Sequence, residues 1–346
     1  MNKICLTGLL PEEISELLPK EKEKYRGVQI FRWIHELGAS SFDDMTNLSK
    51  TFRAEIDNLF TIGACELVEK RTSSDLSTDK FLWRLFDGLS IESVIIRDDD
   101  RITACISSQV GCKMRCSFCR TGEMGFIRNL SAGEILDQLI QMKRILNPVG
   151  EDISNIVFMG MGEPLDNLDA VIKAFRIVNM ETGMEVGQRK TTISTCGIVP
   201  GMSEITNNFA RIGLALSLNA TDDALRTRLM PINKKYPLAA ILEAARAYTN
   251  KTRRRITLEY ILMEGVNDSL EQAEKLLQIA RSMPSKVNLI VYNEYPGSPF
   301  RKPSTSRVEA FQRILTDGGV TAFIRKSKGQ DIMAACGQLA GEKIKK

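Results

Sequence analysis

The sequence has very little histidine, no long apolar run and almost no net charge. Its one histidine is His35, which disfavours a closed zinc site made of paired Cys and His ligands. No run of about 20 apolar residues could span a membrane, and the first residues lack the apolar stretch of a secretory signal peptide. We therefore expect a cytoplasmic protein without a membrane span, in which thiols stay reduced.

The charge balance alone indicates no partner. Lys and Arg number 47 against 43 Asp and Glu, so the net charge is only +4. Most runs of charge are solvated surface, yet local clusters of basic residues could neutralise RNA phosphates. The sequence has no internal repeat and no low-complexity tract. The basic clusters are Arg253 to Arg255, the group Arg325, Lys326 and Lys328, and the tail from Lys343 to Lys346.

Three of the eight cysteines stand close together. Cys112, Cys116 and Cys119 have the spacing C-x3-C-x2-C. Thiolates are soft ligands that select iron–sulfur clusters, zinc or Cu(I). Three of them on one loop can hold three irons of a [4Fe-4S] cluster and leave the fourth iron open for a substrate, whereas electron-transfer clusters usually have four cysteines. Zinc stays open as an alternative, because a further cysteine (Cys65, Cys105, Cys196 or Cys336) could complete its site.

The length of 346 residues predicts one large domain with an appendage. Residues 1–75 are expected to be mostly helical, because Ile30, Phe31, Ile34 and Leu37 recur at helical spacing. Residues 76–97 are expected to form a β-hairpin linker around the Asp87-Gly88 turn.

Residues 98–331 alternate between short apolar strands and amphipathic helices, which predicts a parallel sheet in an α/β core. Possible capping boxes at 131–134 and 268–271 predict the starts of two helices. Six units are too few for a closed eight-stranded barrel, so we expect a partial (β/α)6 barrel with the cysteine loop after its first strand. The predicted strands are 103–107, 153–159, 191–195, 212–218, 256–262 and 287–292.

With the cysteine triplet on this loop, the chain resembles the radical S-adenosylmethionine (SAM) superfamily, and within it the RlmN branch of the RlmN/Cfr RNA methyltransferases. The resemblance runs nearly from end to end, including residues 31–35 in the helical segment. Several long motifs in the same order carry it, at residues 105–112, 158–165 (ending in Gly-Glu-Pro-Leu), 230–236, 265–268 and 331–341.

The resemblance implies methylation at C2 of an adenine in RNA. The substrates would be adenine 2503 of 23S rRNA, in a protein-poor assembly intermediate, and adenine 37 of certain tRNAs. C2 is electron-poor and cannot attack the methyl group of SAM, so the family uses a radical that the reduced cluster generates from SAM. Two SAM molecules per turnover, an electron donor such as flavodoxin, and a monomeric protein are implied as well.

The resemblance also assigns roles to single residues. Cys336, in the C-terminal segment 332–346, corresponds to the cysteine that carries the methyl group as S-methylcysteine. Cys105 corresponds to the thiol that releases the product through a transient disulfide with Cys336. Glu92 corresponds to the proton acceptor. Residues 1–75 and the basic clusters would bind the RNA. Contacts with SAM are implied for Gly162, Glu163, Ser194, Ser217, Leu218, Asn219 and Asn293.

Asn219 stands where much of the family has His, which excludes a titrating side chain there. Cys5, Cys65 and Cys196 are interpreted as small buried hydrophobic residues.

Two alternatives to C2 methylation remain. The Cfr branch methylates C8 of the same adenine, although the segments Gly-Glu-Pro-Leu, Asn-Lys-Lys-Tyr and Gln-Leu-Ala-Gly resemble RlmN more. A zinc-dependent RNA-binding module without catalysis is the alternative from another class. Metal analysis separates the cluster from zinc, since a cubane requires about four irons per chain.

Overall fold

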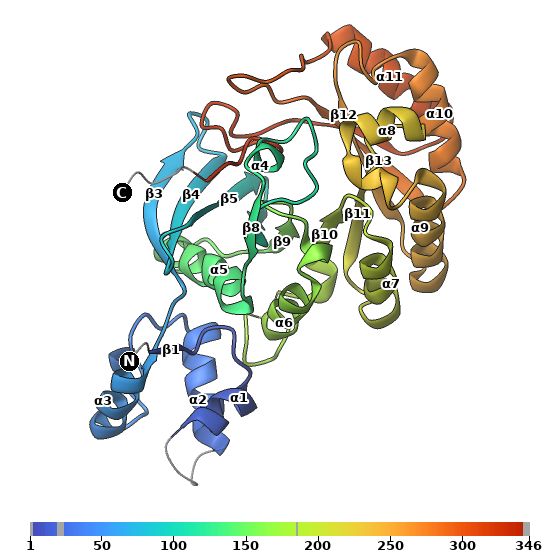
Figure 1. The fold of residues 1–346 in the computed structure, drawn as a ribbon. Helices are drawn as coiled ribbons and strands as arrows, with labels where there is room; N and C mark the ends of the chain where they lie inside the picture. Colours follow the sequence, from blue (N-terminus) through green and yellow to red (C-terminus); the bar gives the residue numbers. More distant parts are fainter. Residues whose placement is uncertain (1–2, 19–23, 185, 342–346) are drawn as a thin grey trace.

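The computed structural model describes residues 3–18, 24–184 and 186–341, so the basic tail 343–346 lies outside the described residues. The N-terminal helices group at one end of the molecule, beside a large sheet that has helices along its outer side (Figure 1). In the described part of the chain, no helix is long and apolar enough to cross a membrane.

The N-terminal part is helical, as predicted, and two very short parallel strands close it. Ile30 and Ile34 are fully buried, whereas Leu37, counted in the helical spacing, lies beyond the helix end and is 52% exposed. Its elements are β1 (Ile4–Cys5), α1 (Pro11–Leu17), α2 (Lys24–His35), the 3-10 turn Phe42–Asp44, α3 (Lys50–Leu59) and β2 (Phe60–Thr61).

A ten-stranded sheet forms the body of the protein, with the strand order β14-β13-β12-β11-β10-β9-β6-β5-β4-β3. The first four strands pair antiparallel: β3 (Cys65–Thr72), β4 (Thr78–Leu85), β5 (Ser90–Asp98) and β6 (Arg101–Cys105). The parallel strands continue from β6 through β9 (Asn155–Phe158), β10 (Thr191–Thr195), β11 (Gly213–Ser217), β12 (Ile256–Leu262), β13 (Ser285–Val291) and β14 (Ala322–Arg325).

Helices connect the parallel strands and cover the sheet, which confirms the predicted α/β fold with an N-terminal domain (Figure 1). Because β14 and β3 are the two ends of the strand order, the sheet stays open. The helices are α5 (Ala132–Leu146), α6 (Leu168–Val178), α7 (Val199–Asn208), α8 (Asp223–Leu229), α9 (Leu238–Thr252), α10 (Leu270–Arg281) and α11 (Thr305–Asp317). The Asp87-Gly88 turn joins β4 and β5 as predicted, and both strands belong to the large sheet.

Several details differ from the prediction. Residues 65–72 form β3 rather than helix, and β14 and the ribbon of β7 (Gln109–Gly111) and β8 (Phe126–Asn129) were not predicted. The predicted capping box at Asp268 is wrong, because Ser269 caps α10 and accepts a hydrogen bond from the Gln272 backbone N–H. Asp268 instead accepts from the Gly265 backbone N–H at 2.9 Å. The capping box of Ser131 and Glu134 at α5 is confirmed.

Candidate active site

A cavity of about 150 Å³ opens at the carboxyl ends of the parallel strands. In sheets of this kind the strand ends and the loops that follow them build the site. Residues from β9 to β13, the cysteine loop and the C-terminal segment line it. The polar and sulfur-bearing lining residues include Cys112, Cys116, Cys119, Glu163, Ser194, Cys196, Ser217, Asn219, Glu259 and Cys336.

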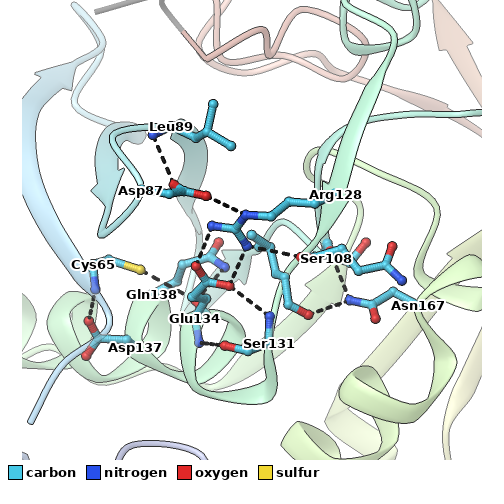
Figure 2. A network of polar contacts seen from close by, with 12 residues as sticks. Cys65, Asp87, Leu89, Ser108, Arg128, Ser131, Glu134, Asp137, Gln138 and Asn167 are labelled. Carbon is cyan, nitrogen blue, oxygen red and sulfur yellow. Dashed lines mark hydrogen bonds and ion pairs between the residues drawn. The ribbon is translucent and has the colours of Figure 1, made fainter. Parts of the chain in front are cut away.

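The loop that carries the cysteine triplet is fixed at both of its ends. The Gln138 side chain on α5 accepts from the Ser107 N–H at 2.9 Å and donates to the Ser107 carbonyl at 3.0 Å. The Asn167 amide donates to the carbonyls of Ser108 and Leu130, both at 2.8 Å (Figure 2). These side chains satisfy main-chain groups that would otherwise be buried without partners. The loop therefore leaves and rejoins the fold at defined points.

Arg128 adds a second tie beside the same loop. On β8, its guanidinium binds Asp87 at 2.6 Å and Glu134 at 2.8 Å (Figure 2). It thereby joins the β4–β5 turn, β8 and the first turn of α5. Such charge-assisted contacts fix orientation as well as adding energy.

The backbone around the cysteines is tightly turned. Gly111 has φ of +73°, and a Cβ there would come 1.8 Å from the Gly125 carbonyl oxygen, so a larger residue does not fit. The Cys119 N–H donates to the Cys116 carbonyl at 3.1 Å, and Cys119 is the N-cap of the short helix α4 (Arg120–Glu123). All three cysteines of this loop line the cavity.

The donor chemistry of the three cysteines suits an iron–sulfur cluster, because thiolates are the ligands that hold such clusters. Among the described residues, no three Cys, His, Asp or Glu side chains lie close enough together to hold a single metal ion. In a cubane each thiolate binds a different iron, so the sulfurs stand farther apart than the ligands of one ion. Desolvation raises the pKa of all three thiols, that of Cys112 to about 12. A bound metal would displace these protons and compensate the buried thiolates.

Gly162 and Glu163 line the cavity just after β9, as expected from the sequence. Gly162 has φ of +100°, and a Cβ there would lie 2.5 Å from the Gln109 side chain. The Glu163 carboxylate accepts from the backbone N–H of Leu165 at 3.1 Å and of Cys196 at 2.8 Å. Burial raises its pKa, and the N–H of Cys196 opposes that rise. A buried acid of this kind can receive a cationic amino group.

Ser194 and Ser217 lie side by side at the ends of β10 and β11, with 3.4 Å between their hydroxyl oxygens. Both hydroxyls donate to Glu259 on β12, at 2.8 and 3.4 Å. Glu259 lines the cavity and is only 7% exposed, and the sequence analysis missed it. Its one sequence signal is an acidic residue inside the otherwise apolar strand Ile256–Leu262. This cluster can bind hydroxyl or amino groups of a ligand.

Asn219 lines the cavity in the left-handed conformation, with φ of +58°. Asn is enriched in this conformation among residues other than glycine, which is a physical reason for an Asn at this position. Its side-chain oxygen accepts from the Ile261 N–H at 2.9 Å.

Leu218 and Asn293 lie outside the residues that line the cavity. The Leu218 side chain is fully buried in the core. Only the backbone N–H and carbonyl of Leu218 are therefore available to polar groups around the cavity. Asn293 donates to the Cys336 carbonyl at 3.1 Å and accepts from Gln330 at 2.7 Å. Both residues therefore position neighbours of the cavity.

The structure brings Cys336 to the cavity from near the end of the chain. The residue as a whole is exposed to solvent, although burial of the Cys336 thiol raises its pKa. The segment after it is bound to the cysteine loop, because Arg120 N–H donates to the Gly337 carbonyl at 2.8 Å and Thr121 Oγ1 to the Leu339 carbonyl at 2.6 Å.

Cys105 is the buried last residue of β6 and does not itself line the cavity. Burial raises its pKa to about 12, and the nearby Cys336 thiol adds to that rise. No disulfide joins any of the eight cysteines, Cys105 and Cys336 included.

Glu92 is 3% exposed and does not line the cavity. One carboxylate oxygen pairs with Lys80 Nζ at 3.0 Å, and the other accepts from the Ala340 N–H at 2.8 Å. Glu92 thus lies under the C-terminal segment, and both of its oxygens are engaged.

The basic clusters lie at different ends of the sheet. Arg253 to Arg255 precede β12, at its amino end and away from the cavity. Arg325 ends β14 and is paired in register with Ile290, which lines the cavity. Arg325 and Lys326 are exposed, whereas Lys328 is partly buried and pairs with Asp98 at 2.9 Å. Of the two basic clusters that lie in the described residues, the second is the one at the carboxyl ends of the strands.

Comparisons with known proteins agree with this architecture. A family model described as the radical SAM superfamily matches residues 106–277, and one described as the ribosomal RNA large subunit methyltransferase N-terminal domain matches residues 5–62. The crystal structure of a radical SAM methyltransferase from Sphaerobacter thermophilus is 41% identical, with a TM-score of 0.94, covering 98% of this chain and 100% of that chain. Fold and cavity together define a radical SAM enzyme.

Proteins of similar sequence identify the family within the radical SAM enzymes. The dual-specificity RNA methyltransferase RlmN of Geobacter sulfurreducens is 46% identical over 340 residues, which are 98% of this chain and 92% of that protein. The protein of the same name from Geotalea uraniireducens is 45% identical over 342 residues, or 99% and 98% of the two chains. The chain belongs to the RlmN family of radical SAM methyltransferases. Membership implies a [4Fe-4S] cluster and SAM as cofactors.

Proposed function

We propose that this enzyme methylates C2 of adenine in RNA, at adenine 2503 of 23S rRNA and adenine 37 of tRNAs, through a methyl group carried by Cys336. The single observation that carries the proposal is the position of Cys336, whose side chain lines the same cavity as Cys112, Cys116 and Cys119. A carrier thiol must reach both the source of the methyl group and the radical, and a shared cavity allows this.

The cysteine triplet would hold the [4Fe-4S] cluster and leave one iron open for SAM, from which the reduced cluster supplies a 5′-deoxyadenosyl radical. Glu163 lies close enough to the triplet to bind the amino group of SAM, and Gly162 leaves room for it. Ser194, Ser217 and Asn219 line the adjoining part of the cavity and offer hydrogen bonds to the rest of the molecule, while Leu218 and Asn293 support it through their neighbours.

The residue chemistry follows in three steps. The Cys336 thiolate takes a methyl group from a first SAM, and a second SAM provides the radical that removes one hydrogen from that methyl. The carbon radical then bonds to C2 of adenine, the adduct radical gives up one electron, for which the oxidised cluster would be the acceptor, and Glu92 takes the C2 proton after release from the Ala340 N–H. Finally Cys105 attacks the Cys336 sulfur, the sulfur–carbon bond breaks, and the released carbon takes a proton to become the methyl group.

The disulfide left between Cys105 and Cys336 must be reduced before the next turnover. We expect this chemistry in the cytoplasm, with an electron donor such as flavodoxin for the cluster and the protein working as a monomer. The helical segment 1–75 and the exposed Arg325 and Lys326 are proposed to hold the RNA, including 23S rRNA in a protein-poor assembly intermediate. A folded RNA must extrude the target base to bring it into the cavity, which costs a few kcal/mol.

Cys336→Ala tests the carrier. We expect methylation of RNA to fall below detection while iron content stays at the wild-type level, because Cys336 is separate from the triplet. The measurement is transfer of label from SAM to RNA by anaerobically reconstituted protein, beside iron analysis. Cys5→Ala, on the first strand and remote from the cavity, is the control. Normal turnover by Cys336→Ala would remove the carrier role.

Cys105→Ala tests product release. Without the resolving thiol the RNA should stay bonded to Cys336, so a protein–RNA species should accumulate under turnover conditions and resist denaturing electrophoresis. The double variant Cys105→Ala with Cys336→Ala should form none. Failure of the single variant to trap RNA would contradict the resolving role of Cys105.

Mass analysis of the modified nucleoside fixes the position of methylation. The proposal expects 2-methyladenosine from both rRNA and tRNA substrates. Recovery of 8-methyladenosine would replace it with the Cfr-type reaction. Zinc with little iron in anaerobically purified protein would contradict the radical mechanism altogether.

A further inference from the structure

Arg226 on α8 is a fully buried cation whose hydrogen bonds within the described residues all go to neutral groups. Its side chain is 0% exposed. The guanidinium donates to the Leu218 carbonyl at 3.1 Å, to Asn233 Oδ1 at 2.9 Å and, through Nη2, to the carbonyls of Cys196 at 2.6 Å and Ser217 at 3.3 Å. In the described part of the chain, none of its hydrogen-bond acceptors is a carboxylate.

A buried guanidinium that is bonded only to neutral groups would be stabilised by a negative charge nearby. Removing a charge from water costs several kcal/mol, and neutral carbonyl groups offset only part of that cost. The four acceptors come from the ends of β10 and β11 and from the turn after α8, so they also hold the charge in a fixed place. A fixed charge in a low-dielectric surrounding acts strongly on nearby ions.

Two places near Arg226 can carry negative charge: the exposed Asp223, which Asn233 links to the guanidinium, and the buried cysteine loop. Helix α8 packs directly on that loop, since Ser117 N–H donates to the Leu229 carbonyl at 2.9 Å. Leu229 belongs to one apolar cluster with Cys112 and Cys196, against which Cys116 also packs. Arg226 therefore lies immediately behind the wall of the cavity, on the side where the triplet stands.

We propose that Arg226 is the buried counter-charge of the iron–sulfur cluster at Cys112, Cys116 and Cys119, and that it raises the reduction potential of this cluster. The inference rests on the cluster assignment of the proposed function. One-electron reduction adds a negative charge to a group already made of thiolates and sulfides. A fixed cation stabilises the reduced form more than the oxidised form, which eases the reduction that SAM cleavage requires.

A purely structural role has a different signature. Through its bonds to the Cys196, Ser217 and Leu218 carbonyls, Arg226 also ties together the strand ends that line the cavity. Loss of those bonds alone would lower thermal stability and SAM affinity, and would leave the potential of an intact cluster unchanged. The potential therefore separates the two roles.

The test compares Arg226→Gln, which removes the charge, with Arg226→Lys, which keeps it. The matched control is Arg228→Gln, an exposed arginine on the same helix. Each protein is reconstituted anaerobically with iron and sulfide, and the cluster potential is measured by redox titration followed by electron paramagnetic resonance, with melting temperature alongside. We expect a lower potential for Arg226→Gln and near wild-type values for the other two. A wild-type potential in Arg226→Gln, or an equal fall in Arg226→Lys, would overturn the inference.

A second variant covers the case in which Arg226→Gln does not hold a cluster. Asn233 accepts from Arg226 Nη1 and donates to Asp223 Oδ1 at 2.9 Å. The pair Asp223→Asn with Asn233→Asp keeps Arg226 and the net charge but moves the carboxylate onto the guanidinium. The potential should then fall, and an unchanged potential would refute the counter-charge role. Absence of iron in the wild-type protein would instead refute the proposed cluster.

Discussion

At the scale of single residues, His35 is a packing residue rather than a ligand. Gly8 N–H donates to its Nε2 at 3.3 Å, and Nδ1 lies 3.0 Å from the Phe31 carbonyl. Burial lowers the pKa of His35 to about 4, against about 6.5 in an unfolded chain. The folded protein thus prefers neutral His35. The stability that comes from keeping His35 neutral is fully present above pH 6.5. It is lost as the pH falls from 6.5 towards 4.

We predict that His35 lowers the free energy of unfolding by about 3 kcal/mol across that window, because each pKa unit corresponds to about 1.4 kcal/mol. Chemical unfolding at several pH values, followed by circular dichroism, measures the effect. His35→Gln cannot titrate, so its unfolding free energy should fall less between pH 6.5 and 4. Parallel curves for the two proteins would contradict the prediction.

Residue chemistry was predictable from sequence where it depended on spacing and motifs. The Cys112, Cys116, Cys119 spacing and the Gly-Glu-Pro-Leu segment led to residues that line the cavity. Glu259 and Arg226 could not be found in this way. Both are ordinary residue types within an apolar strand or an amphipathic helix, and their importance depends on burial, which only packing of distant segments creates.

At the scale of elements, α5 determines how firmly the cysteine loop is held. We predict that Gln138→Ala lowers the iron content after reconstitution and destabilises the protein by about 1–3 kcal/mol, since the buried Ser107 main chain would lose both of its partners. Gln141→Ala is the matched control, because Gln141 binds Cys65 and Asp137 instead. Iron analysis and thermal unfolding check both variants. Equal iron loss in the control would contradict a specific role of Gln138.

Strand prediction succeeded where strands are buried and failed at the margins. The predicted bounds of β10 and β12 agree with the structure to the residue. The residues of edge strand β3 are exposed or half-exposed. Its sequence therefore lacks the buried apolar face by which a strand is predicted. β14 is a four-residue edge strand, and β7 and β8 pair only with each other. Register and edges depend on neighbours that a local pattern does not contain.

At the scale of the whole molecule, the two basic clusters should differ in their effect on RNA. We predict that Arg325→Gln with Lys326→Gln weakens RNA binding and reduces the slope of log affinity against log salt by about 1–2, because each lost phosphate contact contributes roughly 0.7–0.9. Arg253→Gln with Arg255→Gln, at the amino ends of the strands, should leave both unchanged. Fluorescence anisotropy with a labelled tRNA at several salt concentrations measures the slopes. Equal losses in the two double variants would contradict an RNA site at the cavity mouth.

The bonds that fix residues 336–340 also bear on how the enzyme is made. Gly337 and Leu339 bind the cysteine loop, and Ala340 binds Glu92, so segments separated by most of the sequence meet at one centre. Translation runs from the N-terminus, and domains fold largely in that order. The cysteine loop and most strands of the sheet, though not β14, are therefore synthesised well before Cys336. On the proposed function, the nascent chain would contain the cysteine triplet before it contains the carrier thiol, which postpones the reactive state.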